Sequence, residues 1–334
     1  MKKVIVIGAT GNLGAYSSMR LKEDGYEVIA VGGRKCDNGF FEKQGIQYYS
    51  VDIRDKNAFD ILPRGNIDAV VHFAGELPSR YHYDPQALIE TITLGTLNVL
   101  EYMRKVNCLK IIFPQTPFDL SQYHNTDTPT PADERRDFPL TGDHAIYTIA
   151  KNSAVDLIEH YHAEFGISRF ILRFFTIYQY HPNAYHYSNY QRRMMPYRML
   201  MDRAAKGLPI EIWGDPTRAK EMVYIKDFVR LVSLCVNSNI EGGVYNVGNG
   251  WQVSLEEQIR GIIDVFSPKE KPSPVIYCPE KPEALKSAFD ISKTIKDLKF
   301  KPEYSYLDQL KDIKHEMEVE PFALLWGTKE DYQE

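Results

Sequence analysis

The sequence predicts an α/β fold in which a doubly wound parallel sheet is followed by a smaller C-terminal α/β region. Short apolar runs of strand length alternate with longer amphipathic segments through the first half of the chain. Several of these runs are continuously apolar, as strands covered on both faces should be. A glycine-rich stretch joins the first apolar run to the first amphipathic segment. Together these features predict βαβ units, and therefore a parallel sheet.

The expected elements follow from the hydrophobic periodicity. We expect strands at residues 4–7, 27–31, 47–51, 69–73, 110–113 and 169–174. We expect helices at residues 15–24, 85–105 and 147–165. The last helix carries apolar residues three and four apart, and Gly166 follows it where a C-cap glycine is expected.

Size and composition place the chain among folded globular proteins. Its 334 residues exceed the usual size of one domain, so we expect about two domains, or one large domain with an insertion. Apolar residues make up 43% and charged residues 25%. We find no apolar stretch long enough for a membrane span, and the first apolar run ends at Gly8, too early for a signal peptide. We therefore expect a cytoplasmic protein.

The net charge and the spacing of the cysteines argue against several classes of partner and binding site. The net charge of −5 argues against nucleic acid, whose binding needs clustered Lys and Arg. The four cysteines stand far apart, which predicts neither a zinc site nor a disulfide framework. From about residue 178 the sequence becomes rich in Tyr, His and Asn, and we expect a long loop there that covers a ligand. His181 and His186 lie in it, but without ligand spacing, so we expect no metal.

The stretch VIVIGATGNLG, residues 4–14, follows an expected strand and opens an expected helix. Gly8, Gly11 and Gly14 would permit a sharp turn, close approach of a pyrophosphate, and packing of helix on strand. The helix N-terminus would supply N–H donors for the phosphates. The spacing is GxxGxxG rather than GxGxxG, so a strand-to-helix turn without a ligand remains the alternative.

The end of the second expected strand bears on the choice of dinucleotide. Proteins that bind NAD usually carry Asp or Glu there, whereas this chain has Gly32 and Gly33, followed by Arg34 and Lys35. A guanidinium can pair with a 2′-phosphate that a carboxylate would repel. We expect NADP or NAD, with a slight preference for NADP. The alternative is that Arg34 stacks on adenine or faces water.

Two further stretches carry reactive side chains. YTIAK places Tyr147 and Lys151 one helical turn apart on one face, and FPQT ends an expected strand with the hydroxyl of Thr116. A phenol with a pKa of about 10 is a poor base at neutral pH, and a neighbouring ammonium favours the phenolate. Taken alone, the Tyr and Lys pair also fits a solvated helix face.

In this order the motifs resemble the NAD-dependent epimerase/dehydratase family, which are extended short-chain dehydrogenases/reductases acting on nucleotide sugars. The resemblance covers about three quarters of the chain. The matching segments, within residues 4–250, are GATGNLG, VDIRD, VVHFAG, FPQT, YTIAK, LRFFTIY, MVYIKDF and YNVGNG.

The resemblance implies a role for each matched residue. Tyr147 matches the catalytic base, Lys151 the residue that lowers its pKa and holds the nicotinamide ribose, and Thr116 the hydroxyl that hydrogen-bonds the reacting sugar oxygen. Asp52 and Ile53 match an adenine-contacting pair. The implied cofactor-binding residues are Gly8, Thr10, Gly11, Asn12, Leu13, Gly14, Arg34, Lys35, Asp52, Ile53, Phe73, Ala74, Gly75, Tyr147 and Lys151.

The implied substrate contacts are Thr116, Thr176, Arg218 and Lys220. Thr176 stands where the family usually has Asn, and Lys220 where it usually has Arg. Ile92 likewise replaces a common Asn. These departures leave the nucleotide sugar undetermined.

The resemblance also bears on the chemistry. Pro117 and Phe118 stand where the related dehydratases carry Asp-Glu, so we expect an epimerase rather than a dehydratase. A keto-sugar reductase using NADPH is the alternative, encouraged by Arg34. A non-catalytic dinucleotide sensor is a second alternative, against which the retained Tyr147 and Lys151 argue.

We expect a dinucleotide-binding Rossmann domain at residues 1–175, rejoined by 219–250, and a substrate-binding domain at 176–218 and 251–334. Substrate specificity is expected to lie in irregular segments at 76–84 and 178–197. The resemblance implies a homodimer formed by helices around 88–103 and 147–165, with a monomer as the alternative.

Overall fold

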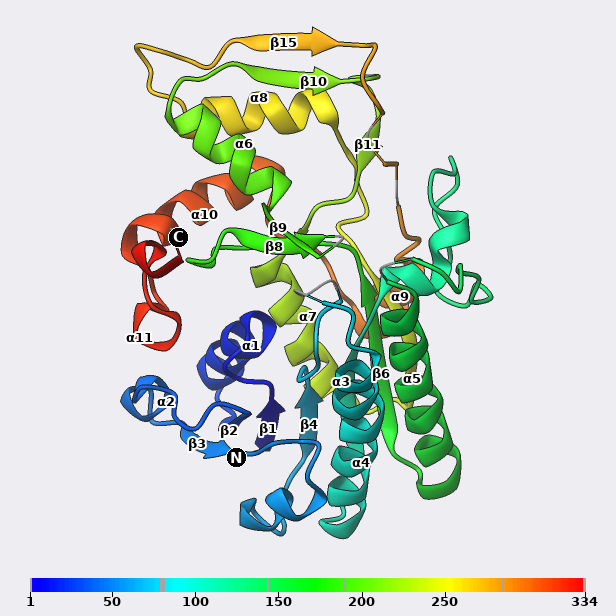
Figure 1. Cartoon of the computed structure of the whole chain (residues 1–334). Helices are drawn as coiled ribbons and strands as arrows, with labels where there is room; N and C mark the ends of the chain where they lie inside the picture. Colours follow the sequence, from blue (N-terminus) through cyan, green and yellow to red (C-terminus); the bar gives the residue numbers. More distant parts are fainter. Residues whose placement is uncertain are drawn as a thin grey trace.

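The computed structural model describes residues 2–78, 82–142, 144–188, 190–283, 285–286 and 288–332. A large sheet flanked by helices forms its lower part, and short sheets and helices form the upper part (Figure 1). The sheet has seven strands in the order β13-β6-β5-β4-β1-β2-β3. Every pairing in it is parallel, which confirms the predicted fold class.

All six expected strands belong to this sheet. A seventh, which was not among those expected, pairs with the last of them at one edge. The strands are β1 (Lys3–Ile7), β2 (Glu27–Gly32), β3 (Gln47–Ser50), β4 (Ala69–His72), β5 (Lys110–Gln115), β6 (Ser168–Phe174) and β13 (Gly242–Val247).

Alternation along β1 explains why helices cover both faces of the sheet. Val4 and Val6 pack in a core with Phe228, on the side of α1 (Asn12–Glu23) and α7 (Ile225–Asn237). Ile5 and Ile7 pack in a second core, on the side of α4 (Gly95–Lys105) and α5 (Ala145–Phe165). Successive side chains of a strand point to opposite faces, so a strand apolar throughout supplies both cores.

The expected helix at 85–105 is three consecutive pieces rather than one. It comprises α3 (Pro85–Leu88), a π-helical stretch at Ile89–Leu94, and α4. The widened turn ends at Gly95, where a Cβ would lie 2.7 Å from Cδ1 of Ile53. Close packing on Ile53 therefore accompanies the π-helical turn, a feature that often stands near functional sites.

Among the described residues, the upper region contains four two-stranded sheets. Their strands pair as β10 (Ile210–Trp213) with β15 (Val275–Cys278), β11 (Ala219–Lys220) with β14 (Val253–Ser254), β12 (Val223–Tyr224) with β7 (Ile177–Tyr178), and β8 (Tyr185–Ser188) with β9 (Gln191–Met194). Its helices include α6 (Pro196–Ala205), α8 (Leu255–Phe266) and α10 (Tyr306–Val319), whereas α11 (Ala323–Trp326) lies lower, beside α1 (Figure 1). The remaining short helices are α2 (Phe40–Lys43), α9 (Ser292–Leu298), η1 (Lys56–Ile61), η3 (Pro117–Tyr123) and η4 (Lys329–Tyr332).

The expectation of a long loop at 178–197 was wrong, because β8 and β9 form an antiparallel hairpin there. Tyr185 pairs with Met194, and the guanidinium of Arg192 lies 3.9 Å from the centre of the Tyr185 ring. Cross-strand contacts of this kind stabilise a hairpin whose composition alone reads as a loop. Residue 189, within that segment, and residues 79–81, within the expected segment 76–84, lie outside the described residues.

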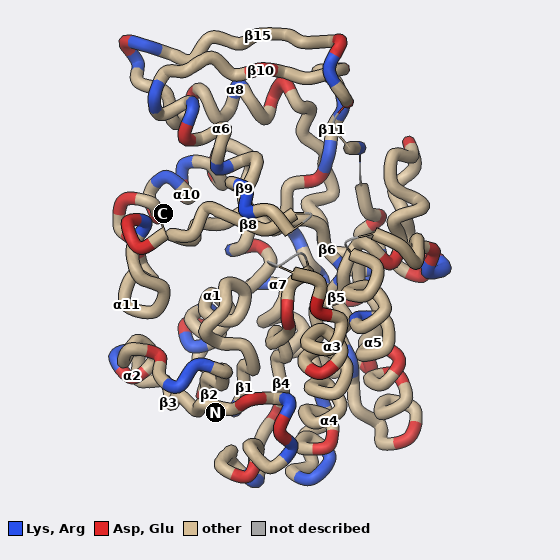
Figure 2. Tube along the Cα trace, viewed as in Figure 1, with Lys and Arg blue, Asp and Glu red and all other residues tan. Residues whose placement is uncertain are grey.

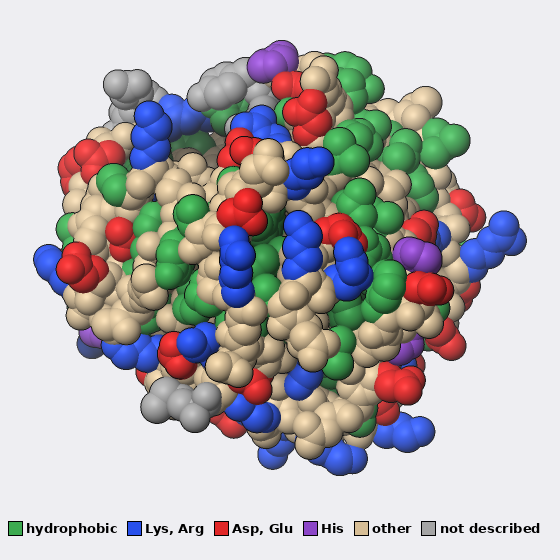
Figure 3. Space-filling model, turned by 90° about the horizontal axis from the view of Figure 1, so that it is seen from below, with side chains coloured by type: hydrophobic (Ala, Val, Ile, Leu, Met, Phe, Trp, Pro, Cys, Tyr) green, Lys and Arg blue, Asp and Glu red, His purple; other side chains and the backbone are tan. Residues whose placement is uncertain are grey.

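Basic and acidic residues are intermingled along the chain trace (Figure 2). Seen from the amino-terminal ends of the main strands, the surface shows the same mixture, with hydrophobic side chains between the charges (Figure 3). Within the described part of the chain, no helix has the length and apolarity needed to cross a membrane.

Candidate active site

The chain turns sharply at Gly8, where β1 ends and α1 is about to begin. Gly8 has φ +89°, and a Cβ on it would lie 2.5 Å from the backbone nitrogen of Ala74. A Cβ on Gly14 would lie 2.1 Å from the carbonyl oxygen of Gly8. Neither position has room for a side chain, so the backbone itself forms the surface of the turn.

This turn, which we call the glycine cradle, presents backbone N–H groups that suit a pyrophosphate. Asn12, Leu13 and Gly14 form the first turn of α1, whose N–H groups and dipole favour an anion. The loop after β4 adjoins it, since the N–H groups of Phe73 and Ala74 both donate to the carbonyl of Ile7 at the end of β1. The predicted phosphate-binding residues therefore meet at the carboxyl ends of the central strands, the edge at which parallel α/β sheets bind ligands.

Beside the turn, the loop after β2 is basic. Arg34 and Lys35 are exposed, and Nη1 of Arg34 donates to the carbonyl of Leu325 at 2.8 Å. The first carboxylate after β2, Asp37, accepts the N–H of Phe41 and so turns toward α2. The predicted adenine-contacting Asp52 forms a two-point ion pair with Arg54, which lowers the pKa of the Asp52 carboxyl. That ion pair was not foreseen from the sequence.

The three predicted catalytic side chains come from two elements. Tyr147 and Lys151 stand one turn apart on α5, and Thr116 directly follows β5. Nζ of Lys151 donates to the carbonyl of Pro114 at 2.9 Å and lies 5.9 Å from the centre of the Tyr147 ring. The buried Thr116 hydroxyl accepts the N–H of Phe118 at 3.2 Å, so its own hydrogen can be donated to a ligand.

A cavity of about 530 Å³ joins these side chains to the predicted substrate contacts. Thr116, Tyr147 and Lys151 line it, as do Thr176, Arg218 and Lys220. The size suits a ligand larger than a monosaccharide. Sequence motifs from four separate places thus meet around one space.

An aromatic wall also faces this cavity. Phe118 packs on His144 with ring centres 4.0 Å apart, and His124 packs on Phe175 at 5.3 Å. No sequence periodicity marks these rings, because they lie in η3 and in loops. Only Phe118 was foreseen as a residue of interest, through its place after Thr116.

Burial sets the electrostatics around Tyr147 and Lys151. It lowers the pKa of the Lys151 amine to about 7 and raises the pKa of the Tyr147 phenol. Both shifts disfavour the charged forms, so the phenolate needs added positive charge nearby. At another part of the cavity wall, Arg218 bonds Glu283 at 2.8 Å and Asn125 at 3.1 Å, and Nζ of Lys220 lies 5.8 Å from the Tyr178 ring centre.

Behind Thr116 lies a buried polar network that sequence reasoning missed. The guanidinium of Arg173 binds the Asp119 carboxylate through Nε at 3.0 Å and Nη2 at 2.8 Å. Gln115 donates to Asp119 and to Asn152 on α5. Burial raises the pKa of Asp119 against the opposing effect of Arg173. The network joins η3 to β6 and α5, and it therefore holds the backbone around Thr116 in place.

A second missed residue, Glu221, lines the cavity next to Lys220. It is 4% exposed, and its carboxylate accepts the N–H groups of Phe289 at 2.9 Å and Gly250 at 3.2 Å. Burial raises the pKa of the Glu221 carboxyl to about 7. A Cβ on Gly248 would lie 2.5 Å from this carboxylate, which explains the glycine there.

The described residues contain no group of three or more His, Cys, Asp or Glu arranged to hold a metal ion. His181 instead packs on the Trp326 ring at 4.6 Å. Ile92, which stands in place of a common Asn, is buried in the π-helical stretch.

Comparison with known proteins places these motifs in a family. Residues 4–248 match the model of the NAD dependent epimerase/dehydratase family. The UDP-glucuronate 4-epimerase of Thermodesulfobacterium geofontis is 27% identical over 86% of this chain and 84% of its own.

Two solved structures share the fold. The UDP-glucose 4-epimerase of Thermotoga maritima with UDP-glucose has a TM-score of 0.74 at 23% identity and covers 95% of this chain and 99% of its own. The UDP-glucuronic acid 4-epimerase of Bacillus cereus in complex with NAD has a TM-score of 0.70 at 22% identity. The match covers 99% of this chain and 100% of that one. With its glycine cradle and family match along most of its length, the chain belongs to the NAD-dependent epimerase/dehydratase family of extended short-chain dehydrogenase/reductase enzymes.

Proposed function

We propose that this enzyme is a nucleotide-sugar epimerase, which inverts one sugar carbon through transient oxidation of its hydroxyl and return of hydride. The observation that carries the proposal is the cavity shared by Thr116, Tyr147 and Lys151 with Arg218 and Lys220. A hydroxyl, a phenol and an amine at one part of its wall suit proton transfer. Two cations at another part suit a diphosphate.

Each residue has a distinct task in this proposal. The nicotinamide dinucleotide, when bound, supplies hydride transfer. Tyr147 takes the proton of the reacting sugar hydroxyl and returns it at the end of the cycle. Thr116 donates a hydrogen bond to the same oxygen, and Lys151 supplies positive charge beside the phenol and holds the nicotinamide ribose.

We infer that the diphosphate lies against Arg218, Lys220 and Thr176. Arg218 can form paired hydrogen bonds with phosphate oxygens, whereas Lys220 contributes charge without that planar geometry. Relatives of this chain carry names that specify UDP-sugars as substrates, and a UDP-sugar is our first candidate here as well.

Dehydration is disfavoured on chemical grounds. Elimination of water needs an acid for the leaving hydroxyl and a base for the neighbouring C–H. Pro117 and Phe118 offer neither, and Phe118 is packed on His144. Among the described residues that line the cavity, the one carboxylate is Glu221, which is held by two backbone N–H groups.

The dinucleotide is either NAD or NADP. The exposed Arg34 and Lys35 after β2, together with an inward-facing Asp37, support a slight preference for NADP. The same residues favour our second candidate function, an NADPH-dependent keto-sugar reductase. A sensor without catalysis is a weaker candidate, because it needs the glycine turn but no phenol and amine beside a buried hydroxyl.

We further propose the assembly and the division of the chain. The family resemblance implies a homodimer through the helices near 88–103 and 147–165, and Leu94 and Phe165, 46% and 42% exposed, offer apolar surface there. The proposed dinucleotide-binding domain comprises 1–175 and 219–250, to which β13 adds a strand of the main sheet. The proposed substrate-binding domain comprises 176–218 and 251–334.

The testing experiment combines cofactor identification with turnover. The protein is purified, its retained dinucleotide is identified by mass spectrometry, and UDP-, GDP- and dTDP-sugars are screened for conversion. An epimerase interconverts two stereoisomers with no net consumption of dinucleotide. Consumption of one NADPH per sugar would instead establish the reductase, and absence of both reactions with firm dinucleotide binding would favour the sensor.

A further inference from the structure

The C-terminal segment, residues 320–332, contacts the glycine turn. Its buried Trp326, 4% exposed, donates an indole N–H to the carbonyl of Thr10 at 2.9 Å. Thr10 stands between Gly8 and Gly11, so a residue near the end of the chain is bonded directly to the turn at its beginning. We call residues 320–332 the C-terminal clasp.

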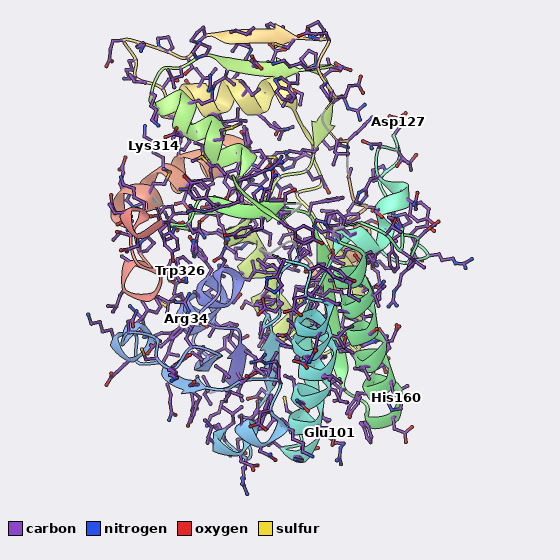
Figure 4. The ribbon with its side chains drawn as sticks, in the orientation of Figure 1. Arg34, Glu101, Asp127, His160, Lys314 and Trp326 are labelled. Atoms are coloured by element: carbon purple, nitrogen blue, oxygen red, sulfur yellow. The ribbon has the colours of Figure 1, made fainter. Side chains whose placement is uncertain are left out.

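The same clasp also binds the loop after β2. Arg34 donates to the carbonyl of Leu325 at 2.8 Å, and Asn38 donates to the carbonyl of Leu324 at 3.2 Å. Arg34 and Trp326 accordingly lie close to one another between α11 and α1 (Figure 4). Two adjoining loops of the dinucleotide cradle are thus tied to the single short helix α11.

The clasp is itself firmly packed. The Trp326 ring lies 4.4 Å from the Phe322 ring and 4.6 Å from the His181 ring, centre to centre. Tyr332 donates to the Trp326 carbonyl at 2.7 Å, and Arg192 of β9 donates to the Tyr332 carbonyl at 2.6 Å. The indole N–H is therefore presented from a well-anchored ring.

On its other side the Thr10 residue is equally confined. A Cβ on Gly32 would lie 2.9 Å from Oγ1 of Thr10, so the Thr10 side chain occupies the space that Gly32 leaves. The next N–H, of Gly11, donates to the carbonyl of Gly8 at 3.0 Å. The Thr10–Gly11 peptide is held from both ends, and it directly precedes the first turn of α1.

We propose that Trp326 is a positioning residue for the dinucleotide. By fixing the Thr10 carbonyl it holds the Thr10–Gly11 peptide, and with it the N–H groups at the start of α1, in the orientation that receives the pyrophosphate. A site preorganised in this way binds more tightly, because less ordering remains for the ligand to impose. The inference rests on the proposed function only through dinucleotide binding, not through the sugar or the reaction.

The test is Trp326→Phe, which removes the N–H donor and keeps an aromatic ring in the clasp. We expect the Kd of NAD and the Kd of NADP, measured by calorimetry without any sugar, to rise by the same factor of roughly 3 to 10, the worth of one hydrogen bond. The factors match because both dinucleotides share the pyrophosphate. Tyr332→Phe, which loosens the anchor but leaves the indole donor, is expected to give a smaller rise.

Phe322→Leu is the matched control, since it disturbs the packing around Trp326 and leaves the indole N–H in place. It should lower the free energy of unfolding while the dinucleotide Kd stays nearly constant. The proposal is overturned if Trp326→Phe binds both dinucleotides as tightly as the unaltered protein, or if Phe322→Leu weakens binding equally at equal loss of stability. A protein that binds dinucleotide in this manner but epimerises no sugar refutes the proposed function alone.

Discussion

The side-chain nitrogen of Lys151 donates a hydrogen bond of 2.9 Å to the carbonyl oxygen of Pro114. That bond joins α5 to β5 two residues before Thr116, and one helical turn after Tyr147. The amine, the phenol and the hydroxyl are therefore fixed relative to one another by a contact between a helix and a strand.

Replacing Lys151 by Met keeps the aliphatic length and removes the amine. We expect kcat/KM to fall roughly 100-fold or more, the usual size of an acid–base contribution, because the phenol loses the neighbouring amine, which is positively charged below its pKa of about 7. The measurement is steady-state turnover of the substrate found in the sugar screen. Lys151→Arg is a control that retains charge without the same reach, and it should recover part of the rate.

The Lys151→Met change should also alter how the free energy of unfolding depends on pH. Unfolded Lys holds its proton up to its ordinary pKa, whereas the folded amine releases it near its lowered pKa of about 7. The unfolded state thus binds more protons between those values, so the free energy of unfolding rises with pH above about 7. Chemical denaturation from pH 6 upward should show this rise in the unaltered protein and lack it in Lys151→Met.

Replacing Thr116 by Val preserves shape and removes the hydroxyl. We expect kcat to fall on the order of 10- to 100-fold, because the reacting oxygen loses a hydrogen bond that matters most as its charge develops. Thr116→Ser retains the hydroxyl and should restore most of the rate. Thr176→Val is the matched change at the proposed diphosphate contact, where KM is expected to move more than kcat.

Replacing Glu221 by Gln tests the buried carboxyl. The folded carboxyl keeps its proton up to a pKa of about 7, above its unfolded value, so its contribution to stability is present at low pH and declines as pH rises to about 7. The decline is on the order of 3 kcal/mol. Glu221→Gln should flatten it in denaturation curves between about pH 4 and pH 8. Glu318→Gln, at an exposed carboxyl of α10, should leave the decline intact.

Replacing Arg173 by Met leaves the fully buried Asp119 without its counter-charge. We expect the free energy of unfolding to fall by about 3–5 kcal/mol, the usual cost of breaking a buried ion pair from one side. Arg169→Met, on the same strand, breaks a more exposed pair with Glu159 and should cost less than about 1 kcal/mol. Equal losses from the two changes would mean that the buried network behind Thr116 is not a structural support.

Much of the Rossmann sheet was predictable, because its strands are buried on both faces and read as continuous apolar runs. The edge strand β13 was not predicted, because Gly242 and Gly243 begin it and Tyr245 and Asn246 interrupt its apolar pattern. The hairpin of β8 and β9 was not predicted, because its stability comes from cross-strand pairs that composition does not reveal.

In the active site, too, some residues were predictable from the sequence and others were not. Thr116, Tyr147 and Lys151 follow motifs whose spacing is local, so the sequence identified them and the structure brings them to one cavity. Arg173 binds Asp119 across 54 positions, and Glu221 binds Phe289 across 68 positions and Gly250 across 29, and no local pattern encodes these contacts. The contact between Trp326 and Thr10 spans 316 positions, and it could not be predicted from the sequence for the same reason.

Turnover by Tyr147→Phe shows whether Tyr147 transfers the proton in an epimerisation. We expect kcat to fall by roughly 1,000-fold or more, while the Kd of the dinucleotide and the free energy of unfolding stay close to those of the unaltered protein. A Tyr147→Phe enzyme that still interconverts its two sugars at an essentially unchanged rate would contradict this role of Tyr147.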